Sequence, residues 1–387
     1  MSLLLPLLLL TVQQRDTVVV TNTDELRRAV LAATPGTEIS VAPGEYQGGL
    51  TFSNIHGKPG KPIIIRQSPR EGTKRATFRG GASGMQFSNV SHLEIDGLTF
   101  VGATGNGLNI DDGGNRDKPS HHIELVSIEV SDLPKGNHDG IKLSGVTDFR
   151  IINAYITQWG GSGIDMVGCH RGEVTLSLFS FGGDSGVQAK GGSSDIAVTR
   201  CFFVNYGERG INIGGSTGRE FFRPPLEKIP AGNRFEAKNI RVEGCYFHLG
   251  RAPFAFVGVD GARVSYNTIR RADRWVLRIL QETNSDDFLA CRNGVFSNNL
   301  ILYGGKSFGT EVNVGPGTKP ESFTFARNLW YRQDSSSGSK PNLPSPELDG
   351  IYGIDPKLSV ESHVYTIPRP SAPEAQKCGA YAYVEKP

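Results

Sequence analysis

The sequence predicts an all-β protein, a right-handed single-stranded parallel β-helix, whose short strands wind into a solenoid with a short capping helix at its start. Two observations predict this fold. A four-residue phrase beginning with glycine recurs at nearly constant intervals, and the composition combines 49 Gly and 20 Phe with only 3 Met in 387 residues. Glycine is typical of turns, and aromatic and β-branched residues are typical of strands.

The repeated phrase is a glycine followed by an apolar, an outward-facing and a second apolar residue. It occurs in succession at Gly140-Ile-Lys-Leu, Gly163-Ile-Asp-Met, Gly186-Val-Gln-Ala and Gly210-Ile-Asn-Ile. The outward positions are separated by 23, 23 and 24 residues and comprise Lys142, Asp165, Gln188 and Asn212. Alternation with a period of two buries one face of each strand. Strands this short and this regularly spaced indicate coils that bury their apolar faces against one another.

A second register of small side chains follows the same coils. Its members are Cys201, Cys245, Asn267, Asn299 and Asn328. Stacked amides can hydrogen-bond between coils at a strand spacing of roughly 4.8 Å. We therefore expect an internal ladder, in which the two cysteines are packed thiols. A disulfide scaffold is not expected, because the chain is long and its five cysteines are an odd number.

The start of the chain differs from the repeat. Residues 1–15 include the apolar run LLLPLLLLTV, which is too short to span a bilayer and is predicted to be a signal peptide. We therefore expect a secreted or periplasmic protein. No later segment has the length and apolarity of a membrane span, so membrane insertion is not expected.

One solenoid domain is predicted over residues 16–333. It begins with a short helix from Asp24 to Ala33, capped by Asn22 or Thr23. Residues 334–387, which begin with a stretch rich in Ser and Pro, are predicted to form an irregular C-terminal segment and cap.

The formal charge excludes one class of partner. It is +2, from 41 basic and 39 acidic residues. This balance is too even for nucleic-acid binding by bulk electrostatics. An acidic polysaccharide or oligosaccharide, the partner we expect, must be recognised by locally placed cations.

Three insertions follow the outward column, at residues 111–120, 216–239 and 281–292. Insertions in repeat proteins gather on the binding side, so these predict a groove along the column. From the longest insertion we expect Arg219, Phe222 and Arg223 to contact a sugar chain. From the column itself we expect the substrate-binding residues to be Lys142, Gln188, Asn212 and Arg278.

Acidic and basic residues meet on this column. Asp139, Asp165 and Asp184 offer the hard oxygen ligands that Ca²⁺ prefers, so Ca²⁺ is the predicted cofactor. β-Elimination from a uronic acid needs a cation that neutralises the sugar carboxylate and a base that takes the adjacent proton. We assign Lys190 as the base and Arg209 as the carboxylate clamp or proton donor.

The segment from Gly186-Val-Gln-Ala-Lys190-Gly through Cys201-Phe-Phe to Gly210-Ile-Asn-Ile resembles the alginate lyase and chondroitinase B family, within the pectate lyase-like superfamily. The resemblance implies a β-helix fold, a lysine base at Lys190 and calcium ligands in the preceding coils. The family's arginine position is occupied here by Gly214, and Arg209 lies a few residues earlier. The family's paired glutamate ligands are absent, and Asp184 is the nearest acid.

A second resemblance supports an alternative. Asn137-His-Asp139-Gly, Gly183-Asp184-Ser and Gly207-Glu-Arg-Gly are similar to motifs of polygalacturonase-type glycoside hydrolases, in which paired carboxylates act as acid and base. Ser185 stands where that family has its second acid. We therefore expect a polysaccharide lyase that cleaves a uronic-acid-containing polymer. The alternatives are a hydrolase or epimerase using the same groove and a non-catalytic glycan-binding protein.

Overall fold

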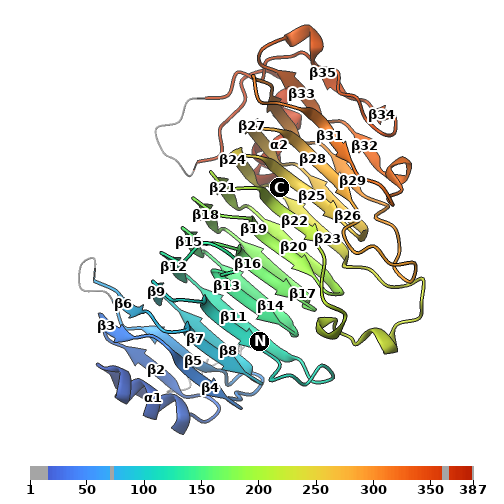
Figure 1. The fold of residues 1–387 in the computed structure, drawn as a ribbon. Coiled ribbons are helices and arrows are strands. Elements are labelled where there is room, and N and C mark those ends of the chain that lie inside the picture. Colours follow the sequence, from blue (N-terminus) through green and yellow to red (C-terminus); the bar gives the residue numbers. More distant parts are fainter. Residues whose placement is uncertain (1–15, 70–73, 360–365, 386–387) are drawn as a thin grey trace, which may run out of the picture.

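A computed structural model describes residues 16–69, 74–359 and 366–385. Within these ranges the strands form three parallel sheets of 13, 12 and 10 strands, here named sheets A, B and C (Figure 1). Each complete coil contributes one strand to each sheet, in the order C, A, B along the chain. The predicted parallel β-helix is therefore confirmed. The signal peptide predicted over residues 1–15 lies outside the described residues.

The strands of the three sheets stack in chain order. Sheet C contains β4 (Leu50–Ser53), β7 (Ser83–Ser88), β10 (Asn106–Asp111), β13 (Ile141–Ser144), β16 (Ser162–Val167), β19 (Ser185–Lys190), β22 (Arg209–Gly214), β25 (Ala252–Val257), β28 (Trp275–Leu280) and β31 (Thr310–Val314). Sheet A contains β1 (Thr17–Val20), β2 (Glu38–Val41), β5 (Ile63–Gln67), β8 (Ser91–Asp96), β11 (Ser120–Val126), β14 (Val146–Ile152), β17 (His170–Thr175), β20 (Ser193–Thr199), β23 (Ala237–Glu243), β26 (Val259–Ser265), β29 (Val295–Ser297), β32 (Thr324–Ala326) and β34 (Glu347–Leu348). Sheet B contains β3 (Gly44–Gln47), β6 (Ala76–Arg79), β9 (Thr99–Val101), β12 (Glu129–Ser131), β15 (Tyr155–Thr157), β18 (Leu178–Ser180), β21 (Phe202–Val204), β24 (Tyr246–Gly250), β27 (Thr268–Ala272), β30 (Leu300–Tyr303), β33 (Leu329–Arg332) and β35 (Ile351–Tyr352).

The corners of each coil use left-handed backbone. In the coil that begins at β16, the chain turns at Gly168 (φ +61°), at Leu176 (φ +54°) and at Phe181 (φ +58°). A positive φ is favourable for glycine and costly for most other residues, so only stacking with the neighbouring coils keeps the other two in place. In this coil two residues separate β16 from β17 and two separate β17 from β18, so each change of direction between sheets is made within a short corner.

The register confirms the predicted outward column. On sheet C, Lys142 pairs with Asp165, Asp165 with Gln188, and Gln188 with Asn212. The column continues through Ala255 to Arg278. All these side chains lie on one face because successive coils keep the same register, and a shift by one residue would turn the column into the core.

One line of the interior, on sheet B, consists of stacked phenylalanines. Phe179, Phe203 and Phe247 follow one another on sheet B with ring centroids 4.8 and 4.7 Å apart and nearly parallel planes. All three are fully buried. Stacking at the strand spacing buries large apolar areas and gives each coil a favourable contact with the next.

The predicted internal ladder is also confirmed. Asn267 Nδ2 donates to Asn299 Oδ1 at 3.1 Å, and Asn299 Nδ2 donates to Asn328 Oδ1 at 3.0 Å. Asn328 Nδ2 then donates to Glu347 Oε1 at 2.8 Å, so a carboxylate ends the ladder. The cysteine members continue it, because Cys245 Sγ accepts from the backbone N–H of Cys201 at 3.5 Å. All five cysteines are buried and free, as expected.

The two ends are closed differently. At the start, α1 (Thr23–Ala32) covers the first coil, with the Asn22 side chain accepting from the N–H of Glu25 at 3.0 Å (Figure 1). This agrees with the predicted capping helix. At the far end, β34 and β35 add one short coil beyond the predicted boundary at residue 333. The described chain ends in α2 (Gly379–Val384), which returns along sheet B to β27 and β30.

The remaining described helices are single 3₁₀ turns, namely η1 (Arg219–Phe221), η2 (Leu226–Lys228), η3 (Pro320–Ser322), η4 (Ser336–Gly338) and η5 (Ala375–Lys377). Among the described residues, every helix is too short or too polar to cross a membrane.

We predict that Asn299→Ala lowers the free energy of unfolding by about 1–3 kcal/mol, because it leaves the buried N–H of Asn267 without its acceptor. Urea or thermal unfolding followed by circular dichroism measures the change. The exposed Asn342→Ala is the matched control and should change stability by less than about 0.5 kcal/mol. Equal stability of the two variants would contradict an energetic role for the ladder.

Candidate functional site

The three insertions lie at one corner of the solenoid, as predicted. Each follows a strand of sheet C and precedes a strand of sheet A: after β10, after β22 and after β28. The middle insertion contacts both others. Arg116 of the first donates to the carbonyl of Glu220 at 3.2 Å, and Arg219 of the middle one pairs with Asp287 of the third at 2.6 Å. The insertions therefore form one continuous wall beside sheet C.

Arg223 holds this wall against the corner of the solenoid. Its guanidinium makes two hydrogen bonds to the buried carboxylate of Asp112, at 2.6 and 3.0 Å. Its side chain runs over Gly145 and Gly168, where any Cβ would lie within 2.6 Å of Arg223. The prediction that Arg223 binds substrate stays a prediction: its charge is paired with Asp112, and its side chain also lines a pocket between sheet C and the middle insertion.

Two other predicted wall residues have different roles. Phe222 is fully buried and packs edge to face on Phe288 in a small core of the insertions, so it cannot contact a ligand and its prediction is wrong. Its neighbour Phe221 is 53% exposed. Arg219 is exposed but paired with Asp287. Alternation along an irregular loop has no fixed period, so the sequence could not tell Phe221 from Phe222.

Glu236 is a structural residue that the sequence analysis did not identify. It is fully buried, and its carboxylate accepts from the N–H of Gly191 at 3.0 Å and from Thr217 Oγ1 at 2.7 Å. Thr283 Oγ1 also donates to it. One carboxylate thus joins a corner of sheet C to the middle and third insertions. No local sequence signal marks it, because its partners come from three segments.

A pocket of about 430 Å³ lies between sheet C and the middle insertion. Lys142, Lys190 and Phe221 line it, together with Thr217 and Asn137. The structure therefore brings the proposed base to the foot of the wall and leaves it open to a ligand.

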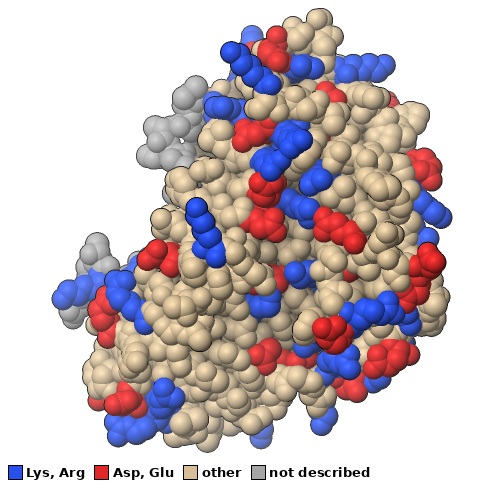
Figure 2. Space-filling model, in the orientation of Figure 1, with Lys and Arg blue, Asp and Glu red and all other residues tan. Residues whose placement is uncertain are grey.

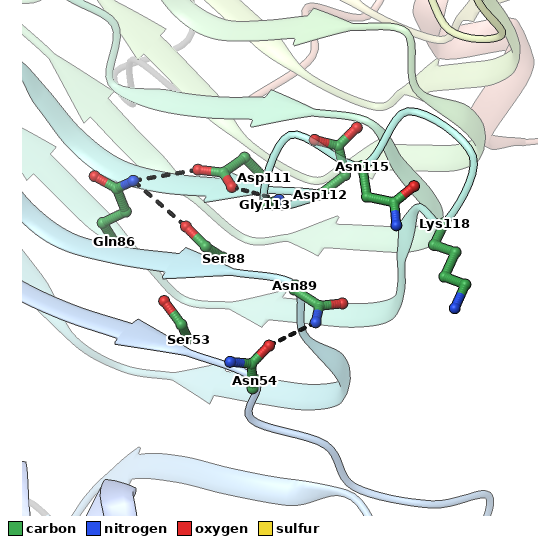
Figure 3. Close-up of a pocket in the computed structure, with 10 residues that line it drawn as sticks. All are labelled: Ser53, Asn54, Gln86, Ser88, Asn89, Asp111, Asp112, Gly113, Asn115 and Lys118. Carbon is green, nitrogen blue, oxygen red and sulfur yellow. Dashed lines mark hydrogen bonds between the residues drawn. The ribbon is translucent and has the colours of Figure 1, made fainter.

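A second pocket, of about 620 Å³, lies on the same sheet nearer the start of the solenoid (Figure 3). Its lining is polar: Gln86 donates to Asp111, and Asn89 donates to Asn54. The two pockets lie along a second line of outward-facing residues, two positions further along each strand of sheet C. Direct strand pairs connect its members, which are Ser53, Ser88, Asp111, Ser144, Val167 and Lys190. Five strand steps span roughly 24 Å, long enough for a chain of several sugar units.

Lys142 lies between two buried carboxylates. Its ammonium contacts Asp139 Oδ2 at 3.0 Å and also binds Asp165 Oδ2, and both aspartates are 1% exposed. Burial, together with repulsion from Asp165, raises the pKa of Asp139. Burial lowers the pKa of Lys142, but attraction to Asp165 and Asp139 outweighs it and raises the value overall. Lys142 is therefore charged at neutral pH, and its charge is paired with buried carboxylates of the protein itself.

Lys190 and Arg209, at opposite ends of adjacent strands, each donate to one of two paired amides. Lys190 Nζ donates to Gln188 Oε1 at 3.1 Å and lies 3.6 Å from Asp165 Oδ1. Arg209 donates to Asn212 Oδ1 at 2.9 Å. Because Gln188 and Asn212 are paired in register, the two cations flank one spot on the groove floor.

Arg209 also carries a carboxylate on its outer side. Its second nitrogen binds Glu282 of the third insertion at 2.7 Å, and this glutamate side chain is 35% exposed. The guanidinium is thus oriented toward a carboxylate at the groove surface. A bidentate donor of this kind suits the carboxylate of an acidic sugar.

Arg278, two coils beyond Arg209, is the remaining predicted contact. Its guanidinium lies 4.3 Å from the ring centroid of Trp275, and its Nε donates to Asn313 at 3.0 Å. Arg274 and Arg251 lie 4.4 and 5.7 Å from the same ring. The outward column therefore reaches an aromatic ring with three cations around it.

The predicted calcium ligands are not gathered around an open position. Asp139 and Asp165 hold the Lys142 ammonium, whereas Asp184 lies exposed at the turn before β19. Among the described residues, these three acids do not form a group whose ligand atoms all lie within 4.8 Å of one another. Ca²⁺ takes about six to eight oxygen ligands. This arrangement does not fit a Ca²⁺ ion.

Charges of both signs are interspersed over the face shown in Figure 2, with no broad basic patch. This distribution agrees with the even charge balance of the chain. Recognition of an anionic ligand would therefore depend on the few cations placed in the groove.

Together, the coil register and the walled groove define a right-handed parallel β-helix protein with a long polar groove on sheet C. Residues 46–223 match the family described as right-handed β-helix region. An alginate lyase from Paenibacillus sp. str. FPU-7 has a similar structure, with a TM-score of 0.54 and 16% identity, over 79% of this chain and 97% of that one. A rhamnogalacturonan lyase is similar with a TM-score of 0.56 and 15% identity, over 82% and 84%.

No curated protein sequence matches this chain. The two similar structures carry the names of polysaccharide lyases, so the resemblance expected from the sequence is confirmed for the fold. At these identities the similarity establishes the architecture, and the chemistry must be argued from the groove itself.

We predict that Lys142→Met lowers the free energy of unfolding at pH 7 by about 3–5 kcal/mol, because it leaves two buried carboxylates without their counter-charge. The unfolded carboxyl pKa is about 3.9, and burial together with repulsion from Asp165 holds the pKa of Asp139 higher in the folded protein. A raised folded pKa means that protonation favours folding, so the deficit should shrink as the pH falls through that value.

Unfolding of the variant and of the wild type, measured from pH 7 to pH 4, tests this prediction. The exposed Lys238→Met serves as the control and should stay within about 0.5 kcal/mol of the wild type. A deficit that does not change with pH would show that Lys142 does not compensate these carboxylates.

Proposed function

We propose that the sheet C groove binds an acidic polysaccharide and cleaves it next to a uronic acid by β-elimination. The observation that carries this proposal is the convergence of Lys190 and Arg209 on the paired amides of Gln188 and Asn212. A lyase needs a base and a carboxylate-binding cation within one sugar unit of each other. The polysaccharide lyases with a similar fold support the proposal.

Arg209 and Lys190 would have different tasks. The guanidinium of Arg209 would bind the sugar carboxylate in place of Glu282 and stabilise the negative charge that develops when the neighbouring carbon loses its proton. Lys190 in its neutral form would take that proton. The C–H electron pair would form a carbon–carbon double bond as the glycosidic C–O bond breaks, and the departing oxygen would take up a proton.

The neighbours of Lys190 hold its amine in place. Asp165 Oδ1 lies 3.6 Å from Lys190 Nζ, and Lys142 binds the other oxygen of that carboxylate. Gln188 Oε1 accepts from Lys190 Nζ at 3.1 Å. These contacts fix the amine at the edge of the pocket between sheet C and the middle insertion.

The alternative of hydrolysis needs two carboxyl groups that reach the substrate. Of the two acids in the hydrolase-like motifs, Asp184 is exposed, whereas Asp139 is 1% exposed and engaged by Lys142. The burial of Asp139 therefore disfavours hydrolysis by this pair.

Export of the protein is proposed as well, on the apolar run within residues 1–15 alone.

We predict that Lys190→Ala lowers the rate of elimination by about 10²–10⁴-fold, the usual contribution of a general base. Arg209→Ala should lower it by about 10²–10³-fold through loss of charge stabilisation. Alginate, pectate and glycosaminoglycans are the substrates to test, and the ultraviolet absorbance of unsaturated ends is the measurement. The surface variant Lys238→Ala is the control and should keep full activity.

The products separate the candidate functions. Unsaturated ends support the lyase, reducing ends without absorbance support a hydrolase, and binding without either product supports a glycan-binding protein. A Lys190→Ala variant that stays folded and fully active would refute the assignment of the base.

We predict that elimination continues at an unchanged rate in excess EGTA and is not increased by CaCl₂, because the Lys142 ammonium already occupies the position between Asp139 and Asp165. Initial rates with chelator and with added calcium give the comparison. If activity requires Ca²⁺ and Asp184→Asn weakens that requirement, the acids rearrange around a metal and the prediction fails.

A further inference from the structure

Three histidines gather on sheet A, away from the sheet C groove. They are His92 of β8 and His121 and His122 of β11. The ring centroids of His92 and His122 are 4.4 Å apart, and those of His92 and His121 are 5.3 Å apart. Three of the chain's eight histidines therefore meet on two adjacent coils.

Backbone geometry explains how neighbours in sequence face the same side. In a regular strand, His121 and His122 would point to opposite faces. His92 and His122 both have positive φ, +48° and +56°, and are skipped in the pairing of β8 with β11. Because both strands have this left-handed residue at the same position, their register is kept. Both rings of β11 lie outside the core, and His121 Nδ1 comes to 2.9 Å from His122 Nδ1.

The spacing suits metal coordination. One nitrogen from each ring can be chosen so that all three lie within 4.8 Å of one another. In a tetrahedral zinc site each nitrogen is about 2.0–2.1 Å from the ion, which places neighbouring ligand atoms about 3.3 Å apart. His121 Nδ1 and His122 Nδ1 are 2.9 Å apart because they share a hydrogen bond, so a small rotation of the rings would separate them enough to hold an ion. Among the described residues, no other group of histidine, cysteine or acidic side chains meets this spacing.

The surroundings leave room for an ion and for a further ligand. His92 and His122 line a hollow of about 270 Å³, which Glu124 and Asp148 also line. Imidazole nitrogens are common ligands of transition metals, and the two carboxylates that line the hollow could supply a further oxygen ligand.

We propose that His92, His121 and His122 form a binding site for one divalent transition-metal ion such as Zn²⁺, with a coordination position open toward the hollow. Imidazole ligands select such ions over Mg²⁺ and Ca²⁺, which prefer oxygen. The bound ion would join β8 to β11 and so stabilise two coils near the start of the solenoid. The site is separate from the proposed lyase groove and does not depend on it.

Titration calorimetry of the full chain, made without a polyhistidine tag and dialysed against chelator, tests the proposal with ZnCl₂. We expect one Zn²⁺ per chain and a rise in the unfolding temperature that CaCl₂ and MgCl₂ do not produce. Co²⁺ in place of Zn²⁺ should give the visible absorption of a four-coordinate site.

His92→Ala, His121→Ala and His122→Ala should each weaken Zn²⁺ binding at least tenfold and remove the rise in unfolding temperature. His248→Ala, in β24 on sheet B, is the control and should bind as the wild type does. Far-ultraviolet circular dichroism without metal verifies that each variant is folded. Absence of stoichiometric Zn²⁺ binding, or unchanged binding by a folded variant that lacks all three histidines, would overturn the proposal.

Discussion

Parallel hydrogen bonding between successive coils places every outward side chain about 4.8 Å from its counterpart on the next coil. In this chain the constraint acts on all three sheets at once, because each coil contributes a strand to each of them. The interior follows it with stacked phenylalanines and an asparagine ladder. The exterior follows it with the column that joins Lys142 to Asn212. The groove chemistry is therefore a consequence of register, since residues distant in sequence become neighbours without any special loop.

The same constraint explains why the fold and part of the site could be predicted from the sequence. A period of about 23 residues identifies the strands and the column, and the ladder follows the same coils once the insertions that lengthen some of them are allowed for. Lys190 and Arg209 could be found because each has a fixed position relative to the repeated glycine phrase. Their meeting at Gln188 and Asn212 follows from the pairing of β19 with β22.

The remaining site residues lie outside the period. Arg223 pairs with Asp112, 111 residues earlier, and no local pattern indicates such a partner. Phe222 of the middle insertion is buried because it packs on Phe288 of the third insertion. The ion pairs of Lys142 with Asp139 and Asp165 show a further limit: charges on one column suggest a metal site, but distances decide whether they neutralise one another.

The wall of the groove is built mainly from one segment between β22 and β23, which is attached through Arg223 and Glu236. The solenoid beneath it is also joined to this segment through the backbone, because the N–H of Gly192 donates to the carbonyl of Glu236 at 2.9 Å and the N–H of Arg223 donates to the carbonyl of Gly191 at 3.1 Å. Removal of the segment would leave the buried carboxylate of Asp112 without its partner. An exchange of this segment among related solenoids would therefore have to keep Arg223 and Glu236, so ligand specificity can change only within the limits that the stability of the coils sets.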